Sequence, residues 1–146
     1  MTLPDPATAL TGPDLARVRR ILAVARRVGM LLLSSGAQTT EVEVGLRRLT
    51  SDLGLEDVQV GVFYSSIQLS YVEPGDFKPT TIVQMASDRT SDFTRLSDVT
   101  SLLRRVSSGD LDLEGAESAL TGIEQDVRHG PLWLVRDDYG SANRHE

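Results

Sequence analysis

The hydrophobic positions of the first half of the chain follow a helical period on both sides of one interruption. From Asp14 to about Ser34, apolar residues recur every three or four positions, at Leu15, Val18, Leu22, Ala25, Val28 and Leu32. After the stretch SSGAQTTEVEV, the same spacing returns at Val42, Leu46, Leu49 and Leu53. This spacing is typical of helices that bury one face, so two helices are predicted with a joint between them.

The joint itself has the residues of a helix stop followed by a helix start. Gly36 is expected to end the first helix in the left-handed conformation. Thr40 and Glu43 have the spacing of a capping box, and Thr39 is an alternative cap. Because Gly54 follows the second apolar run, a helical hairpin is predicted that ends there.

The middle of the chain changes to the pattern of β-strands. Residues 58–66, 67–73 and 80–87 are rich in β-branched and aromatic residues, and Ile67, Leu69 and Tyr71 alternate with polar residues. A tight turn is expected near Tyr64–Ser66 and a longer one at Pro74–Pro79. These segments predict a three-stranded antiparallel meander.

Helical periodicity returns over residues 93–107 and again from Leu113 to Val127, with Gly109 between the two runs and Asp112 as the expected cap. The predicted order is ααβββαα, a two-layer α+β domain in which helices cover one face of the sheet. Residues 1–12 are expected to be a disordered tail and residues 13–130 the domain. Residues 131–146 are predicted to form a polar C-terminal tail with one apolar run, Leu132 to Val135.

Composition limits the classes of function. The chain has 146 residues, which fits one domain, and no cysteine, which excludes disulfides and thiolate chemistry and suits a reducing compartment. The net charge is −6, which argues against nucleic acid as the partner. No signal peptide or run of about 18 apolar residues is visible, so a soluble cytoplasmic protein is expected, with any membrane association made through a partner.

Residues that could perform catalysis are sparse. The two histidines, His129 and His145, follow the last predicted helix, and Ser65-Ser66 suits a turn better than a nucleophile. Asp110, Asp112 and Glu114 alternate, but they lack the glycine and the final glutamate of a calcium loop. We therefore expect no enzyme activity, no metal and no cofactor.

The helix start at Thr39, Thr40 and Glu43 is the best candidate for a ligand site. Free N–H groups at a helix N-terminus suit a carboxylate, and Glu43 could meet an ammonium group, as in a small amino or carboxylic acid. Such a site would be a pocket that also contains Gln68 or Gln84. The same residues could instead serve only as caps.

Arginines are concentrated on the first helix. Residues 17–27 hold five arginines and no lysine, among them Arg19 and Arg26. Arginine pairs with carboxylates and phosphates in bidentate fashion, so this face could contact an acidic partner or anionic lipid. A solvated face is the simpler alternative.

Several motifs in this order resemble the soluble N-terminal domain of the threonine/serine exporter family. The resemblance covers roughly residues 15–127 and depends on these segments: Ser35-Gly36-Ala37, Thr39, Val42-Glu43, Leu53-Gly54, Thr80-Thr81, Asp92 to Leu96, and Gly109 to Ala116. In that family the domain precedes about ten membrane helices, or part of them in split versions, and the complete protein exports threonine, serine or related small acids.

This sequence departs from the family where the first membrane helix should begin. Arg136, Asp137 and Asp138 follow the apolar run, and three adjacent charges oppose membrane insertion. The resemblance therefore implies a stand-alone domain or one part of a split system, acting as partner or regulator of a membrane transporter subunit. The alternatives are a small-molecule-binding or hydrolase-like domain that uses the Thr39–Glu43 helix start, and a self-associating dimer.

Overall fold

The computed structural model describes residues 12–73, 79–86 and 92–126. For residues 12–14 it describes the backbone only. Four helices and three strands are formed in the predicted order ααβββαα: α1 (Gly12–Ser34), α2 (Thr39–Asp52), β1 (Gln59–Val62), β2 (Ser66–Tyr71), β3 (Thr80–Met85), α3 (Phe93–Ser107) and α4 (Leu113–Glu124). The α+β class is confirmed. Both predicted tails lie outside the described residues, except Gly12, which is the first residue of α1.

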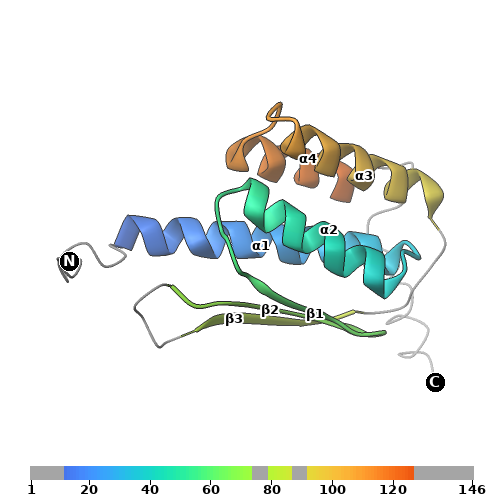
Figure 1. The fold of residues 1–146 in the computed structure, drawn as a ribbon. Helices are drawn as coiled ribbons and strands as arrows, with labels where there is room; N and C mark the ends of the chain where they lie inside the picture. The colour runs from blue at the N-terminus through green and yellow to red at the C-terminus, as the bar shows by residue number, and fades with distance from the viewer. Residues whose placement is uncertain (1–11, 74–78, 87–91, 127–146) are drawn as a thin grey trace, which may run out of the picture.

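The helices form two tiers above one face of the sheet (Figure 1). The α1–α2 pair lies directly on the sheet, and the α3–α4 pair lies on the α1–α2 pair. The predicted cover of one sheet face by helices is present, but only the first two helices provide it. The arrangement is therefore sheet, helix pair, helix pair, with one tier more than the two layers expected from the sequence.

The sheet is an antiparallel meander with strand order β1-β2-β3. Val60, Leu69 and Ile82 lie side by side across the three strands and point toward the helices. Strand side chains alternate between the two faces, so the neighbouring positions in each strand point away from the helices. The tight turn expected near Tyr64–Ser66 is formed by residues 63–65, where the Phe63 N–H donates to the Ser66 carbonyl oxygen at 2.8 Å.

Helix α1 occupies the centre of the molecule. It contacts α2, α3 and α4 as well as strands β2 and β3. Residues 31–35 are all buried, which an amphipathic surface helix would not allow. The enclosed second half of this helix therefore forms much of the hydrophobic core.

The joint between α1 and α2 confirms one prediction and corrects another. Gly36 has φ of 100°, and the Ala37 N–H bonds to the Leu32 carbonyl oxygen at 3.0 Å, which closes the end of α1 in the left-handed conformation. The capping box, however, is not formed. The helix begins two residues earlier than a Thr40 cap predicts, with Gln38 as the N-cap and no side-chain cap bond, so neither Thr39 nor Thr40 is the cap.

The other helix ends follow the sequence closely. Asp112 caps α4 as expected, accepting from the Gly115 N–H at 2.8 Å. Asp92 caps α3 in the same way, accepting from the Arg95 N–H at 3.0 Å. Gly54 and Gly109 have positive φ where α2 and α3 end, a region that favours glycine.

Candidate functional site

The three residues of the predicted ligand site lie together on the first two turns of α2. Thr39 and Thr40 lie in the first turn of α2. Glu43 lies farther along the helix and pairs with Arg47 at 2.8 Å, an i, i+4 contact on the helix surface. Gln68 and Gln84 lie on opposite faces of the sheet. Only Gln84 lies on the face of the sheet that the helices cover, and the pocket of Glu43 with one of these glutamines stays a prediction.

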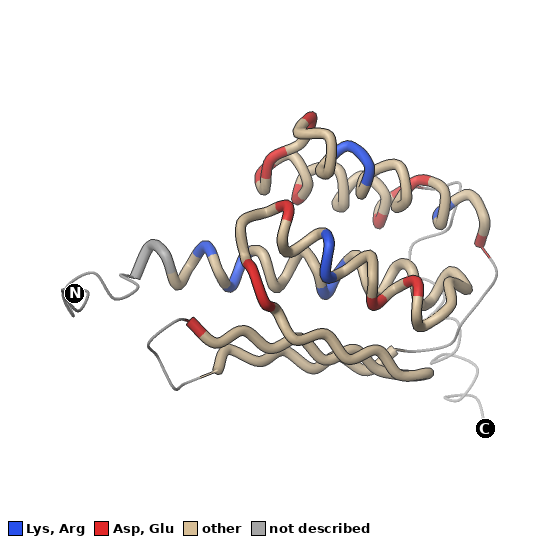
Figure 2. Tube along the Cα trace, in the orientation of Figure 1, with Lys and Arg blue, Asp and Glu red and all other residues tan. Residues whose placement is uncertain are grey.

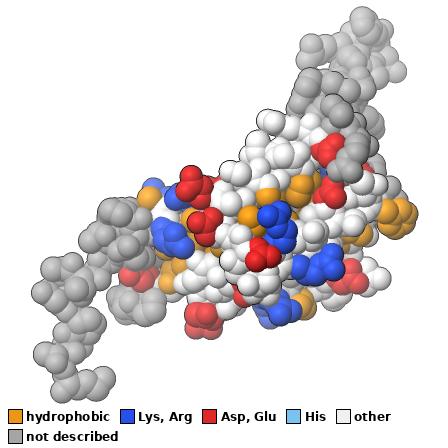
Figure 3. Space-filling model, turned by 90° about the horizontal axis from the view of Figure 1, so that it is seen from above, with side chains coloured by type: hydrophobic (Ala, Val, Ile, Leu, Met, Phe, Trp, Pro, Cys, Tyr) orange, Lys and Arg blue, Asp and Glu red, His pale blue; other side chains and the backbone are white. Residues whose placement is uncertain are grey.

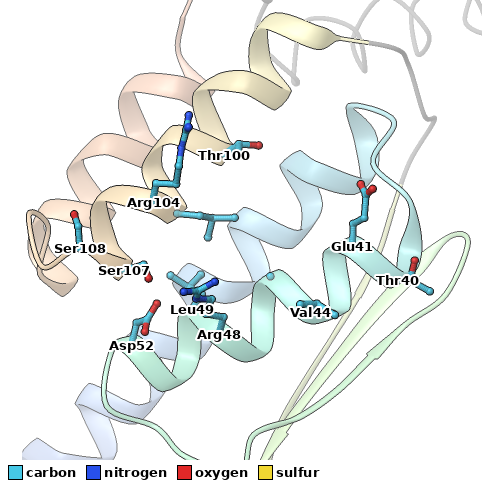
Figure 4. A pocket seen from close by; sticks show the side chains of 12 residues that line it. Thr40, Glu41, Val44, Arg48, Leu49, Asp52, Thr100, Arg104, Ser107 and Ser108 are labelled. Atoms are coloured by element: carbon cyan, nitrogen blue, oxygen red, sulfur yellow. The ribbon is translucent and has the colours of Figure 1, made fainter.

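Helices α2 and α3 run parallel, with their N-termini at the same end (Figure 1). A groove lies between them (Figure 4). Its volume is about 680 Å³, within the range of ligand pockets. Most of its surface is apolar, and Val44, Leu49 and Leu103 contribute to it. Of the predicted site residues, only Thr40 lines this α2–α3 groove.

Charged side chains of both signs surround the α2–α3 groove (Figure 4). Glu41 lies near the start of α2, Arg48 and Asp52 lie in its second half, and Arg104 lies in the second half of α3. None of these four has an ion-pair partner within the part of the chain that the structure describes. The groove therefore offers an apolar surface bordered by charges that are available to a ligand.

Two arginines of α1 bind α4 rather than a partner. Arg20 forms an ion pair with Glu117, and Arg27 forms one with Glu124 and donates to the Thr121 hydroxyl at 3.1 Å. These pairs are seven residues apart on each helix, so they link two parallel helices in register. This part of the arginine-rich face holds the fold together.

The two arginines predicted as contact residues differ from each other. Arg26 is half-buried, and its Nη1 donates to the Gln84 side-chain oxygen on β3 at 3.3 Å. Arg19 is exposed and has no hydrogen bond or ion pair among the described residues. Of the two, only Arg19 remains available for an outside contact.

The Arg20–Glu117 pair changes the ionisation of both groups. The hydrogen bond from Arg20 and its positive charge lower the pKa of Glu117 below the ordinary value of 4.5. The same hydrogen bond and the negative charge of Glu117 raise the pKa of Arg20. Because both side chains are partly exposed, water screens this interaction and its effect on stability is small.

Acidification is expected to remove the contribution of this pair. The unfolded chain binds a proton at Glu117 more readily than the folded chain does. The stabilisation that the pair gives the folded state is therefore fully present above pH 4.5 and is lost as the pH falls through the lowered pKa of Glu117. Melting temperatures of the wild type and Glu117→Gln should differ slightly at neutral pH and converge below pH 4.5. A difference that stayed constant down to about pH 3 would contradict this assignment.

The face of the sheet that points away from the helices is exposed and carries no charged residue. Strand positions on this outer face are Gln59, Gly61, Ser66, Gln68, Ser70, Thr81, Val83 and Met85. Phe63 continues it, since its ring lies 3.4 Å from where a Gly61 side chain would begin. Val83, Met85 and Phe63 are 61%, 64% and 58% exposed, so one end of the outer face is strongly apolar.

Charge is distributed very differently on the two sides of the molecule. The helical side carries interspersed basic and acidic side chains (Figure 3). The three strands carry none along their length (Figure 2). Depletion of charge together with exposed aromatic, methionine and aliphatic side chains is characteristic of protein–protein interfaces.

A buried polar junction joins two distant sequence motifs. The Asp92 N–H donates to the Ser35 carbonyl oxygen at 3.2 Å, which docks the start of α3 on the α1–α2 joint. Arg95 is only 4% exposed, and its Nε lies 4.0 Å from the Asp92 carboxylate. The burial of Arg95 has no signal in the sequence, because an arginine three positions after a cap is ordinary at an exposed helix start.

Within residues 12–73, 79–86 and 92–126, no group of three His, Cys, Asp or Glu side chains could hold a metal ion. Both histidines lie outside these ranges. Among the described helices, none combines the length and the apolar character needed to cross a membrane.

The groove and the outer face were not predicted, although weak signals exist in the sequence. Val44 falls off the apolar stripe of its helix, and it is 67% exposed beside the α2–α3 groove. On β3 the sequence TTIVQM has no charged residue, so it gives no contrast between an inner and an outer face. An apolar residue off the stripe and a strand without charge are the signals that could have indicated these surfaces.

Comparisons with known proteins identify a family and two curated relatives that match this chain. A family model described as "Putative threonine/serine exporter" matches residues 23–140. A "Probable threonine/serine exporter" of Mycobacterium tuberculosis (strain ATCC 25618 / H37Rv) is 27% identical over 124 residues, which are 85% of this chain and 23% of that protein. A "Threonine/serine exporter" of Corynebacterium glutamicum is 28% identical over 123 residues, 84% of this chain and 25% of that protein.

No solved structure matches the chain. The chain spans about a quarter of the length of the curated relatives that it matches. The shared region includes all the elements described above except the first half of α1.

Proposed function

Because the chain belongs to the threonine/serine exporter family, we propose that it is the partner or regulatory domain of a membrane transporter for threonine, serine or related small acids. In this proposal solute passes through the transporter, and the domain acts by contact with it at the cytoplasmic side. This chain matches only about a quarter of each curated relative. In this proposal, the partner corresponds to the part of such a relative that this chain does not match.

The observation that carries this proposal is the uncharged outer face of the sheet. An exposed sheet face in a protein with 25% charged residues would ordinarily carry lysine or glutamate among its polar positions. Here the strand positions are serine, threonine, glutamine and glycine, with Val83 and Met85 at one end. A surface without charge complements a partner surface that is also uncharged, as expected for the ends and connections of membrane helices.

The geometry suits a moderate contact rather than a permanent one. A six-residue strand is about 20 Å long and three strands are about 14 Å wide, so the outer face alone is smaller than a standard interface of about 800 Å² per partner. The exposed Phe63 and Tyr64 at the hairpin extend it. A contact of this size can form and release, as regulation of a transporter requires.

Export by a chimeric transporter tests the proposal. This chain would replace the matching segment of the Corynebacterium glutamicum threonine/serine exporter, and threonine efflux would be measured in cells that lack their own exporter. We expect the chimera to export threonine, and the double substitution Val83→Arg with Met85→Arg to reduce export at least tenfold. Both positions are exposed, so the melting temperature of the isolated chain should remain within about 2 °C.

Ser118→Arg on α4 is the matched control, since it also adds arginine at an exposed position but lies on the helical side. It should export as the parent chimera does. The proposal would be refuted if the chimera exported no more threonine than an exporter from which the segment has been deleted. Full export by the double variant would refute it as well. A concentration-dependent dimer that the double variant abolishes would assign the outer face to self-association instead.

A further inference from the structure

We propose that the C-terminal segment 131–138, PLWLVRDD, docks in the α2–α3 groove of its own chain. This segment lies outside the described residues, and nothing in the proposed function requires it to bind there. Three independent features support the assignment: the chemistry of the groove, the order of charges along the segment, and the length of chain available to reach it.

The apolar part of the segment matches the apolar surface of the groove. Residues 132–135 are Leu, Trp, Leu and Val, the longest apolar run after α4. The groove presents Val44, which is 67% exposed, together with Leu49 and Leu103. Apolar surface on both sides is removed from water when the two meet, at about 25 cal/mol for each Å².

The charges that follow the apolar run complement those of the groove. Asp137 and Asp138 come directly after Arg136. Arg48 and Arg104 border the groove in the second half of each helix, and Asp52 lies beside them. The groove can therefore pair its arginines with the two aspartates of the segment and its aspartate with Arg136. Neither arginine has an ion-pair partner among the described residues, so binding would not require an existing pair to break.

The chain is long enough, and it arrives at the correct end. Asp126, the last described residue, lines a small hollow between α3 and α4 together with Asp98. Thr100, on α3 close to Asp98, lines the end of the groove where α2 and α3 begin. Leu132 is six positions after Asp126, and six steps of extended chain span up to about 20 Å, more than the roughly 10–12 Å width of a helix.

The order of apolar and charged residues along the segment matches their order along the groove. A segment that enters beside Thr100 meets Val44 and Leu103 first and Arg48 and Arg104 afterwards. The groove is about 18 Å long from Thr40 to Asp52, which accommodates a four-residue apolar run and the charges after it. The family match extends to residue 140 and so includes the whole segment.

Trp133 is the only tryptophan, so its fluorescence in the full chain reports directly on the segment. We expect emission at shorter wavelength than in the guanidinium-unfolded chain, and acrylamide quenching at least threefold weaker. Val44→Arg should raise quenching at least twofold, whereas Val83→Arg, equally exposed but on the outer face of the sheet, should leave it unchanged. Arg48→Glu with Arg104→Glu should also raise quenching, and adding Asp137→Arg with Asp138→Arg should reverse that rise.

Each other outcome overturns the proposal. Quenching in the wild type equal to that in the unfolded chain would show that Trp133 is in solvent. Protection that Val44→Arg does not change would place the segment elsewhere on the molecule. Protection that increases with protein concentration would assign it to the groove of a second copy. If the combined variant with all four charges reversed did not restore the protection of Trp133, Arg48 and Arg104 would not pair with Asp137 and Asp138 as proposed.

Discussion

Replacing Gly29 with valine is expected to lower the free energy of unfolding by about 2–3 kcal/mol, a fall of about 5–10 °C in melting temperature. A β-carbon at this position would lie 2.6 Å from Ile67 Cδ1 and 2.9 Å from Leu46 Cδ1. Both neighbours are almost completely buried, so they cannot turn away into solvent. Thermal or chemical unfolding followed by circular dichroism would measure the loss.

Gly122→Val is the matched control, because Gly122 is also in a helix but nothing lies within 4 Å of its β-carbon position. Valine and glycine differ little in helix propensity, so this variant should remain within about 0.5 kcal/mol of the wild type. Equal losses from the two substitutions would show that backbone propensity, and not the close approach of α1 to α2 and β2, determines the effect.

Asp92→Ala is expected to destabilise the protein by about 2–3 kcal/mol. About 1 kcal/mol comes from the lost cap of α3, where the carboxylate accepts from the Arg95 N–H. The remainder comes from the Arg95 guanidinium, which is buried and would lose a nearby carboxylate. Urea unfolding at neutral pH would measure the change.

The second N-cap of the protein provides the comparison. Asp112 caps α4 by the same type of bond, from the N–H three residues later, but the residue at that position is Gly115 and not a buried arginine, so Asp112→Ala should cost only about 1 kcal/mol. Asp92→Asn keeps an oxygen for the cap and removes only the charge, and it should fall between the wild type and Asp92→Ala. If Asp92→Ala and Asp112→Ala had equal effects, the contribution assigned to Arg95 would be wrong.

Local rules allowed most of the fold to be predicted. The apolar spacing of residues 14–34 and 42–53 predicted α1 and α2, and the alternation of Ile67, Leu69 and Tyr71 predicted β2 and its inner face. Gly36 and Asp112 were predicted in their observed roles, because left-handed backbone and caps depend on one or two neighbouring residues. A meander also follows from short connections between neighbouring strands.

The candidate sites depend on contacts between distant segments, and there the sequence was insufficient. Thr40 and Glu43 fit a capping box, but the α1–α2 joint starts the helix at Gln38 and leaves Glu43 to pair with Arg47. The α2–α3 groove requires two helices separated by about 40 residues to lie side by side, and each contributes only half of it. No local pattern encodes such a surface.

The arginines of α1 show the same limit. Five arginines on one helix were interpreted either as a solvated face or as a contact surface for an acidic partner or anionic lipid. The structure places Glu117 and Glu124 of α4 opposite Arg20 and Arg27. The complementary charges were present in the sequence, with the members of each pair 97 positions apart, but only the parallel packing of the two helices connects them.

The enclosure of α1 between the sheet and the second helix pair has a consequence for biosynthesis. This helix leaves the ribosome before every segment that surrounds it, and its last neighbour, α4, emerges nearly a hundred residues later. Contacts so distant in sequence slow folding, and until they form the apolar residues of this helix are exposed and can aggregate. Newly made chains should therefore depend on chaperones until synthesis has passed α4.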